Sequence, residues 1–112
     1  MSSDRGTTDA ISALDIALAD SVLFLREHGE RHVSGRLAAT RLRLEGGDLD
    51  AIQTALIEAT GSMGSFRDLI LSARNGHAVS ADQELLANAR LASLVTRVYD
   101  TAREALSAVE AS

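Results

Sequence analysis

The chain of 112 residues contains no cysteine and no proline, and all 11 of its basic residues are arginine. The absence of cysteine excludes disulfides, thiol catalysis and thiolate metal sites. The absence of lysine excludes a Walker-type phosphate loop and Schiff-base chemistry. Because no proline forces a helix to break, glycine has to end the helices.

Long hydrophobic runs and a strong positive charge are missing as well. No stretch of about 18 apolar residues occurs, so we expect no membrane span. The polar start, MSSDRGTTDA, lacks the apolar region of a signal peptide, so a cytoplasmic protein is expected. The net charge of −5 disfavours nucleic acid as a partner, because that binding depends mainly on neutralising phosphates. We expect one domain at residues 9–110 after a disordered tail at residues 1–8.

Hydrophobic residues recur at steps of three and four along most of the chain, as in helices with one buried face. The pattern predicts four main helices, at about residues 9–28, 31–45, 49–60 and 80–110, joined by short loops. The expected fold is all-α, a compact bundle of these four helices plus one short helix, with up-down connectivity and a long C-terminal helix. The residues expected near the centre of the core are Leu14, Leu18, Leu56, Val95, Tyr99 and Leu106.

The C-terminal helix opens with a capping-box pattern, Ser80 followed three residues later by Gln83. An apolar stripe follows at helical spacing and is interrupted by Asn88. A helix of this length with a wide apolar arc should form the spine of the bundle. It could also support a homodimer, although Asn88 and several alanines disfavour a sustained coiled coil.

Residues 61–79, GSMGSFRDLILSARNGHAV, interrupt the helical pattern and contain three of the eight glycines. Ser65 and Asp68 form a second capping-box-like pair, which predicts a short helix at about residues 66–73. The Asn-Gly pair that follows either ends this helix or turns a β-hairpin. The large apolar side chains expected to pack against the bundle are Met63, Phe66, Leu69 and Ile70.

Three motifs, HGERH at 28–32, GDLD at 47–50 and the whole of segment 61–79, resemble a family of small bacterial domains of unknown function. The resemblance extends over about residues 10–105 and rests most on the MGSF-x-DL core. The family pattern has Trp at the position of Val33 and Asn at the position of Arg67. The family implies a fold-sized unit with a marked segment and no established activity. If that Asn carries a function, this chain has lost or changed it.

Metal binding and catalysis each have a simpler alternative here. His28 and His32 have the spacing of a helical metal pair, but the glycine between them favours a helix end, where His28 interacts with the C-terminal carbonyls. Ser65, Asp68 and His77 could act as nucleophile, orienting group and base. The first two are explained more simply as capping partners. We therefore expect no metal, no cofactor and no catalytic residue.

The exposed polar residues of segment 61–79 are the candidate site, since function tends to lie on surface loops of a rigid scaffold. The predicted function is a non-enzymatic protein-binding module, such as a regulator, antitoxin or immunity protein of a bacterial cytoplasm. The alternative is a small-ligand or anion-binding domain, in which amides of the glycine-rich turn at 61–67 hold the anion. The candidate site residues are Gly64, Ser65, Arg67, Asn75 and His77.

Overall fold

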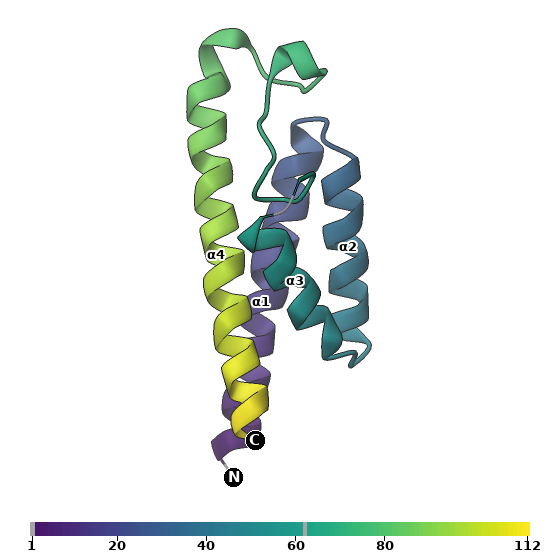
Figure 1. Cartoon of the computed structure of the whole chain (residues 1–112), viewed down its shortest axis with the longest axis vertical. Helices are drawn as coiled ribbons and strands as arrows, with labels where there is room; N and C mark the ends of the chain where they lie inside the picture. Colours follow the sequence, from purple (N-terminus) through teal and green to yellow (C-terminus); the bar gives the residue numbers. More distant parts are fainter. Residues whose placement is uncertain (1, 62) are drawn as a thin grey trace.

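Four α-helices run alternately up and down beside one another, in a bundle that measures 51 × 22 × 21 Å (Figure 1). The computed structural model describes residues 2–61 and 63–112, with side chains from residue 5 onward. The elements are α1 (Ser2–Glu27), α2 (His32–Glu45), α3 (Asp50–Thr60), the 3-10 turns η1 (Ala73–Asn75) and η2 (Ala81–Gln83), and α4 (Glu84–Ala111). These described ranges contain no strand, which confirms the predicted all-α bundle with its long C-terminal helix. None of the described helices is long and apolar enough to cross a membrane.

Helix α1 is longer than the sequence predicted. The prediction placed its start at residue 9, after a disordered tail at residues 1–8, but the helix already begins at Ser2; residue 1 lies outside the described residues. No proline stops the helix from extending through these turns. Thr7 Oγ1 donates a hydrogen bond to the carbonyl of Ala108 at 3.3 Å, near the end of α4. The first turns of α1 therefore pack against the last turns of α4, at the end of the bundle where both termini lie (Figure 1).

The core is made from one face of each helix and is closed by two side chains of segment 61–79, Phe66 and Leu71, both fully buried. Of the six residues predicted at its centre, Leu14, Leu18, Leu56 and Val95 are buried, and Leu106 is partly buried. The prediction for Tyr99 was wrong, because this side chain is 37% exposed. It lies beside Thr60, where α3 ends and no longer covers α4.

The short length of α3 gives segment 61–79 its place in the fold. At about 1.5 Å per residue, the 11 residues of α3 span roughly 16 Å, whereas the 28 residues of α4 span roughly 42 Å. Half of α4 would therefore have no neighbour on this side of the bundle. Figure 1 shows segment 61–79 continuing past the end of α3 and lying along the upper half of α4.

The predicted short helix at residues 66–73 does not form. Residues 63–68 make a series of turns, residues 69–72 are extended, and η1 follows. The backbone N–H of Leu71, which a helix would direct to the carbonyl four residues earlier, instead donates to the side chain of Asn88 at 2.8 Å. The hairpin alternative is not found either, since no strand flanks the Asn-Gly pair in the described residues. Asn75 is instead the last residue of η1, which Gly76 ends in the left-handed conformation with φ of 84°. The Ser80 side chain makes no cap hydrogen bond at the start of η2.

Core packing predicts which leucines of the chain are needed for stability. Leu94 is 3% exposed, so Leu94→Ala should lower the free energy of unfolding by about 2–5 kcal/mol. Leu106→Ala should cost less, because Leu106 is only partly buried. Leu42→Ala is the control: this side chain is 69% exposed and its loss should change stability by less than about 0.5 kcal/mol. Urea unfolding followed by far-ultraviolet circular dichroism measures all three, and equal losses would contradict the packing described.

Candidate functional site

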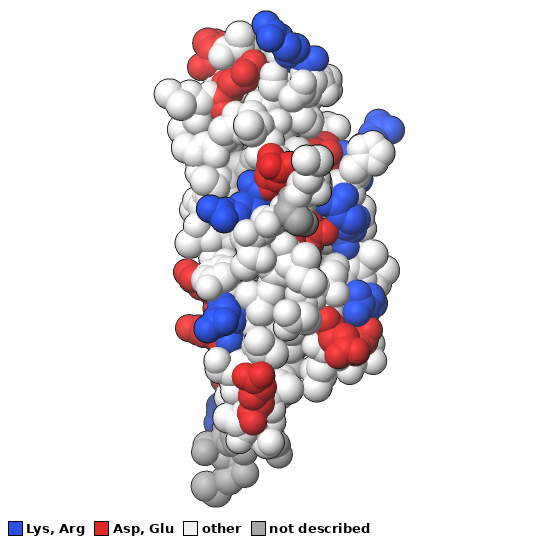
Figure 2. Space-filling model, viewed as in Figure 1, with Lys and Arg blue, Asp and Glu red and all other residues white. Residues whose placement is uncertain are grey.

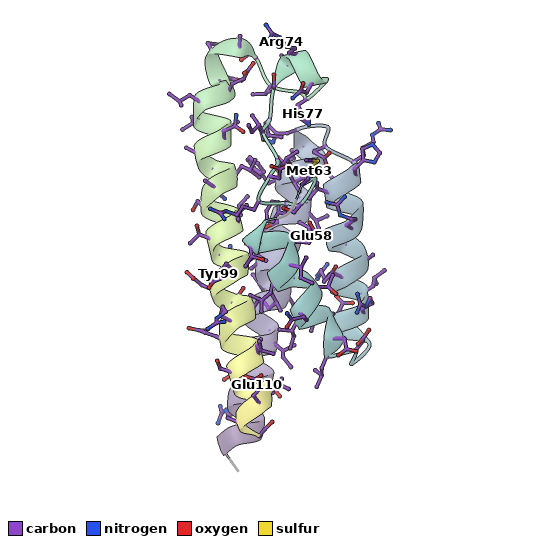
Figure 3. The ribbon with its side chains drawn as sticks, in the orientation of Figure 1. Glu58, Met63, Arg74, His77, Tyr99 and Glu110 are labelled. Atoms are coloured by element: carbon purple, nitrogen blue, oxygen red, sulfur yellow. The ribbon has the colours of Figure 1, made fainter. Side chains whose placement is uncertain are left out.

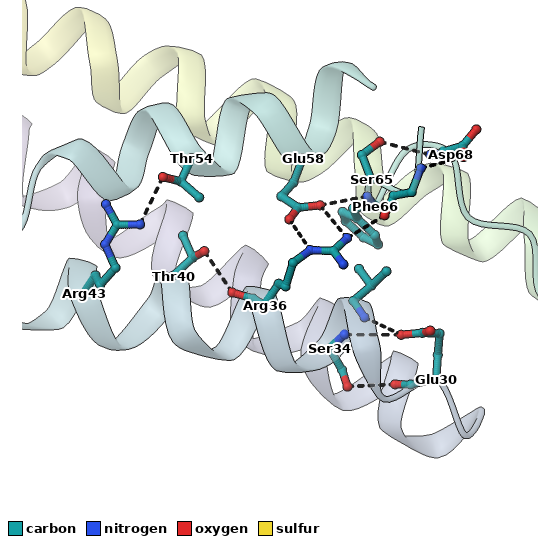
Figure 4. Close-up of polar contacts among 12 residues, drawn as sticks. Glu30, Ser34, Arg36, Thr40, Arg43, Thr54, Glu58, Ser65, Phe66 and Asp68 are labelled. Carbon is teal, nitrogen blue, oxygen red and sulfur yellow. Dashed lines mark hydrogen bonds and ion pairs between the residues drawn. The ribbon is translucent and has the colours of Figure 1, made fainter. Parts of the chain in front are cut away.

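Glu58, in the last turn of α3, is a carboxylate in the interior of the bundle, with 10% of its side chain exposed. Its Oε2 accepts a hydrogen bond from Nε of Arg36 on α2 at 2.8 Å. Its Oε1 accepts from Nη2 of Arg36 at 3.2 Å and from the backbone N–H of Phe66 at 2.9 Å. Figure 4 shows the carboxylate between α2 and the turn that follows α3. One side chain thus joins two helices to segment 61–79.

Arg36 extends the same junction to the tip of the turn. Its Nη2 also donates to the carbonyl of Gly64 at 2.6 Å. The pKa of Arg36 is raised, mainly by the hydrogen bond to Glu58. This bond and the charges of Glu58 and Glu30 together outweigh desolvation, which would lower the pKa. The guanidinium is 46% exposed while the carboxylate is nearly buried, so the carboxylate is the member that would be costly to leave unpaired.

The backbone amides of the glycine-rich turn are occupied by acceptors of the chain itself. The N–H of Gly64 donates to Oδ2 of Asp68 at 2.9 Å, and the N–H of Arg67 donates to the Glu58 carbonyl at 3.0 Å. The N–H of Asp68 donates to the carbonyl of Ser65 at 3.0 Å and lies 3.4 Å from its Oγ. Asp68 thus directs its own amide to Ser65 but caps the amide of Gly64, so the predicted pairing of Ser65 with Asp68 is found in one direction only. It closes a turn and not a helix.

The second half of the segment is fixed from the side of α4. The amide group of Asn88 accepts from the N–H of Leu71 at 2.8 Å and donates to its carbonyl at 2.9 Å, so it pairs with the extended backbone as a neighbouring strand would. Further along, Nδ1 of His77 accepts from the N–H of Ser72 at 3.0 Å, and the N–H of His77 donates to the Ser72 carbonyl at 3.1 Å. This two-way pair closes the loop around η1.

Residues 67–70, which we call the ridge, separate two depressions of the surface. Between the ridge and α4 lies the α4 groove, of ≈ 740 Å³. On the other side, toward the α1–α2 connection, lies the polar hollow, of ≈ 360 Å³. Leu69 and Ile70 line both depressions. The α4 groove is otherwise lined mainly by Arg67, Leu85, Asn88 and Val95, and the polar hollow by Glu30, Gly64, Ser65, Asp68, Asn75 and His77.

The structure divides the five predicted site residues between these depressions. Gly64, Ser65, Asn75 and His77 come together around the polar hollow. Arg67 lies on the far side of the ridge and lines the α4 groove. Arg67 and Asn75 are exposed, as expected, whereas His77 is half-buried because its ring accepts the amide of the loop.

Two apolar side chains of the segment point away from the core. Met63 is 97% exposed and Ile70 is 65% exposed, so the prediction that they pack inward was wrong. Phe66 and Leu71 fill the space beneath them. On α4, Leu85 beside the groove is 85% exposed. Figure 3 shows Met63 and His77 on the segment between α4 and α2, and in Figure 2 this face carries scattered charges of both signs with no extended patch of either.

Three polar residues that organise the site were missed by reasoning from the sequence. Glu58 follows Ala51 and Ala55 at helical spacing, so it falls on the buried stripe of α3. Asn88 interrupts the apolar stripe of α4 in the same way. Glu30, which is 7% exposed, follows the glycine that ends α1. For Glu58 and Asn88 the available signal was a polar side chain inside an apolar stripe, where burial requires a hydrogen-bond partner.

The histidine and acidic residues considered for metal binding and catalysis have other hydrogen-bond roles in the structure. No three acidic or histidine side chains there are placed to hold a metal ion. His28 instead contacts the end of α1, with Nδ1 2.8 Å from the carbonyl of Phe24. Ser65, Asp68 and His77 line the same hollow, but Asp68 bonds the Gly64 amide and Nδ1 of His77 accepts from the backbone.

Glu58→Ala should be among the most damaging single substitutions outside the apolar core. It leaves the buried N–H of Phe66 without an acceptor and removes the charged hydrogen bonds of Arg36, with an expected cost of roughly 2–4 kcal/mol in the free energy of unfolding. Glu58→Gln should cost less, because its amide oxygen can still accept from Phe66. Asp20→Ala removes an ion pair whose members are 44% and 47% exposed, and should cost less than about 1 kcal/mol. Chemical denaturation would contradict the assignment if the two alanine variants lost equal stability.

Gly64 has φ of +82°, a conformation that side chains with a β-carbon disfavour. Gly64→Val should therefore destabilise the fold by about 1–2 kcal/mol or more. Gly35→Ala is the matched control, because Gly35 lies in α2 with open space around it and should gain about 0.5–1 kcal/mol. Thermal unfolding of both variants checks this difference in sign; a valine tolerated at position 64 would argue against the turn described.

The comparisons with known proteins add a partial family match. A family model described as a domain of unknown function (DUF6966) matches residues 26–80. This stretch runs from the end of α1 through segment 61–79 and leaves out α4, so it is shorter than the expected resemblance over residues 10–105. No curated protein and no solved structure matches the chain. Part of the chain, including the five predicted site residues but not the α4 side of the groove, is thus similar to an uncharacterised domain family.

Proposed function

We propose that the chain is a non-enzymatic protein-binding module that contacts its partner with Met63 and the ridge at residues 67–70. The observation that carries the proposal is the contrast between the backbone and the side chains of this segment. The backbone is held from below by Glu58 and Asn88. The side chains of Met63 and Ile70 are nevertheless 97% and 65% exposed.

This contrast suits recognition for an energetic reason. A loop that must become ordered on binding loses conformational entropy, and that loss reduces the affinity. Here the hydrogen bonds to Glu58 and Asn88 have already ordered the backbone. Methionine is a flexible, polarizable side chain that adapts to an apolar contact, and Ile70 adds a rigid one. Burial of both side chains by a partner would remove apolar surface from water, and little conformational entropy of the loop would be lost.

The α4 groove offers a matching apolar surface next to the ridge. Its apolar lining includes Leu69, Ile70, Leu85 and Val95, and the acid Glu84 also lines it. Its volume of ≈ 740 Å³ is within the usual range of binding sites. Arg67 at its edge has no acidic partner among the described ion pairs. A partner helix or loop with an apolar face and a carboxylate would complement this side of the ridge.

As a setting, we propose the cytoplasm of a bacterium and a role of the regulator, antitoxin or immunity type. The arginine-rich composition and the net charge of −5 fit this setting. The anion-binding alternative has less support, because the amides of Gly64, Arg67 and Asp68 already donate to acceptors within the chain. Two carboxylates, those of Glu30 and Asp68, line the neighbouring hollow and would repel an anion.

The double substitution Met63→Glu with Ile70→Glu tests the proposal. Captured from a lysate of the host organism, a specific partner should bind the wild-type chain and be lost from the double variant. Calorimetry with the purified partner should then give an affinity at least about tenfold weaker, or 1.4 kcal/mol.

The matched control is Leu23→Glu with Leu42→Glu. These side chains are 61% and 69% exposed on α1 and α2, and neither lines the groove or the hollow. The control should bind the partner as the wild type does. A partner that binds the ridge variant with unchanged affinity would show that the interface lies elsewhere.

A further inference from the structure

Glu30 is a nearly buried acid among the residues that line the polar hollow. The residue is 7% exposed, and its Oε2 caps α2 by accepting from the N–H groups of Val33 at 2.6 Å and Ser34 at 3.4 Å. Its Oε1 takes part in no hydrogen bond among the described residues. Every fully buried side-chain oxygen of those residues has a hydrogen-bond partner. Since Oε1 has none, it must be accessible to solvent. Glu30 is also one of the residues that line the polar hollow.

The rest of the hollow is also suited to a positive charge. Asp68 contributes a second carboxylate, of which only Oδ2 is bonded, to the Gly64 amide. Nδ1 of His77 accepts from the Ser72 amide and is therefore not a donor toward the hollow. The neighbouring Arg36 does not line the hollow, because its guanidinium is engaged with Glu58 and the Gly64 carbonyl. Two carboxylates therefore belong to the lining of the hollow, and the charge of Arg36, which attracts Glu30, is already paired with Glu58.

We propose that the polar hollow receives the guanidinium group of an arginine side chain from the binding partner. This inference rests on the proposed function and names a chemical feature of the partner. The acidic and histidine groups of the hollow are not placed to converge on a metal ion, but a planar group with five N–H donors can reach separated acceptors. Leu69 and Ile70 supply an apolar wall for the methylene groups of the same side chain.

A titration with small probes tests this subsite without the partner. The ¹⁵N-labelled chain is mixed with N-acetyl-arginine amide, and backbone amide shifts are followed by NMR. The arginine derivative should shift Gly64, Ser65, Asn75 and His77 in a saturable manner at millimolar concentration. N-acetyl-citrulline amide, which has nearly the same shape and no charge, should shift none of them. Equal shifts from citrulline, or from the lysine derivative, would overturn the assignment to a guanidinium.

Glu30→Gln is the decisive variant, because glutamine keeps an oxygen to cap α2 and removes the charge. It should weaken binding of the arginine derivative at least tenfold, while Asp100→Asn, an exposed acid on α4, should leave it unchanged. If Glu30→Gln fails to fold, Asp68→Asn provides the same test from the other wall. Unchanged binding in a folded variant at either position would overturn the proposal. Because no partner is involved, that failure would leave the ridge proposal to its own capture experiment.

Discussion

The carboxylate of Glu58 is the constraint on which the rest of this structure depends. A charged group with 10% exposure is tolerated only if its oxygens are satisfied, and here both oxygens are, by Arg36 and by the amide of Phe66. The carbonyl of the same residue accepts the amide of Arg67. Because these contacts come from α2, α3 and the following turn, the position of each element depends on the other two.

This junction explains how α4 is covered beyond the end of the short helix α3. Helix α3 ends where Gly61 adopts φ of 93°, and the amides of Phe66 and Leu71 further along are directed to Glu58 and Asn88. Segment 61–79 therefore covers α4 with two buried side chains, Phe66 and Leu71, and leaves Met63 and Ile70 outside. The hydrogen bonds that hold Phe66 and Leu71 in the core also fix the position of the ridge between the α4 groove and the polar hollow. Stability and the proposed recognition thus share one set of contacts.

The helices could be predicted from the sequence because apolar spacing is a local signal, and α2 to α4 begin and end within a few residues of the prediction. The segment between α3 and α4 could not, because its conformation is set by side chains 8 and 17 residues away, Glu58 and Asn88. Its local signals were partly right: the amide of Asp68 does turn back to Ser65, although the Asp68 carboxylate caps Gly64, and four candidate residues do meet at one hollow. The local sequence pattern could not predict that Arg67 would line the α4 groove while the other four residues line the polar hollow.

Native-state hydrogen exchange of individual amides, followed by NMR, tests the central claim most directly. If Glu58 and Asn88 hold the segment, the amides of Phe66 and Leu71 should exchange about as slowly as those in the middle of α3, because they open only when the bundle does. The amide of Met63, at the exposed tip, should exchange much faster. Rapid exchange at Phe66 and Leu71 in an otherwise protected bundle would contradict this claim. Segment 61–79 would then open independently of the helices, and Glu58 and Asn88 would not hold it.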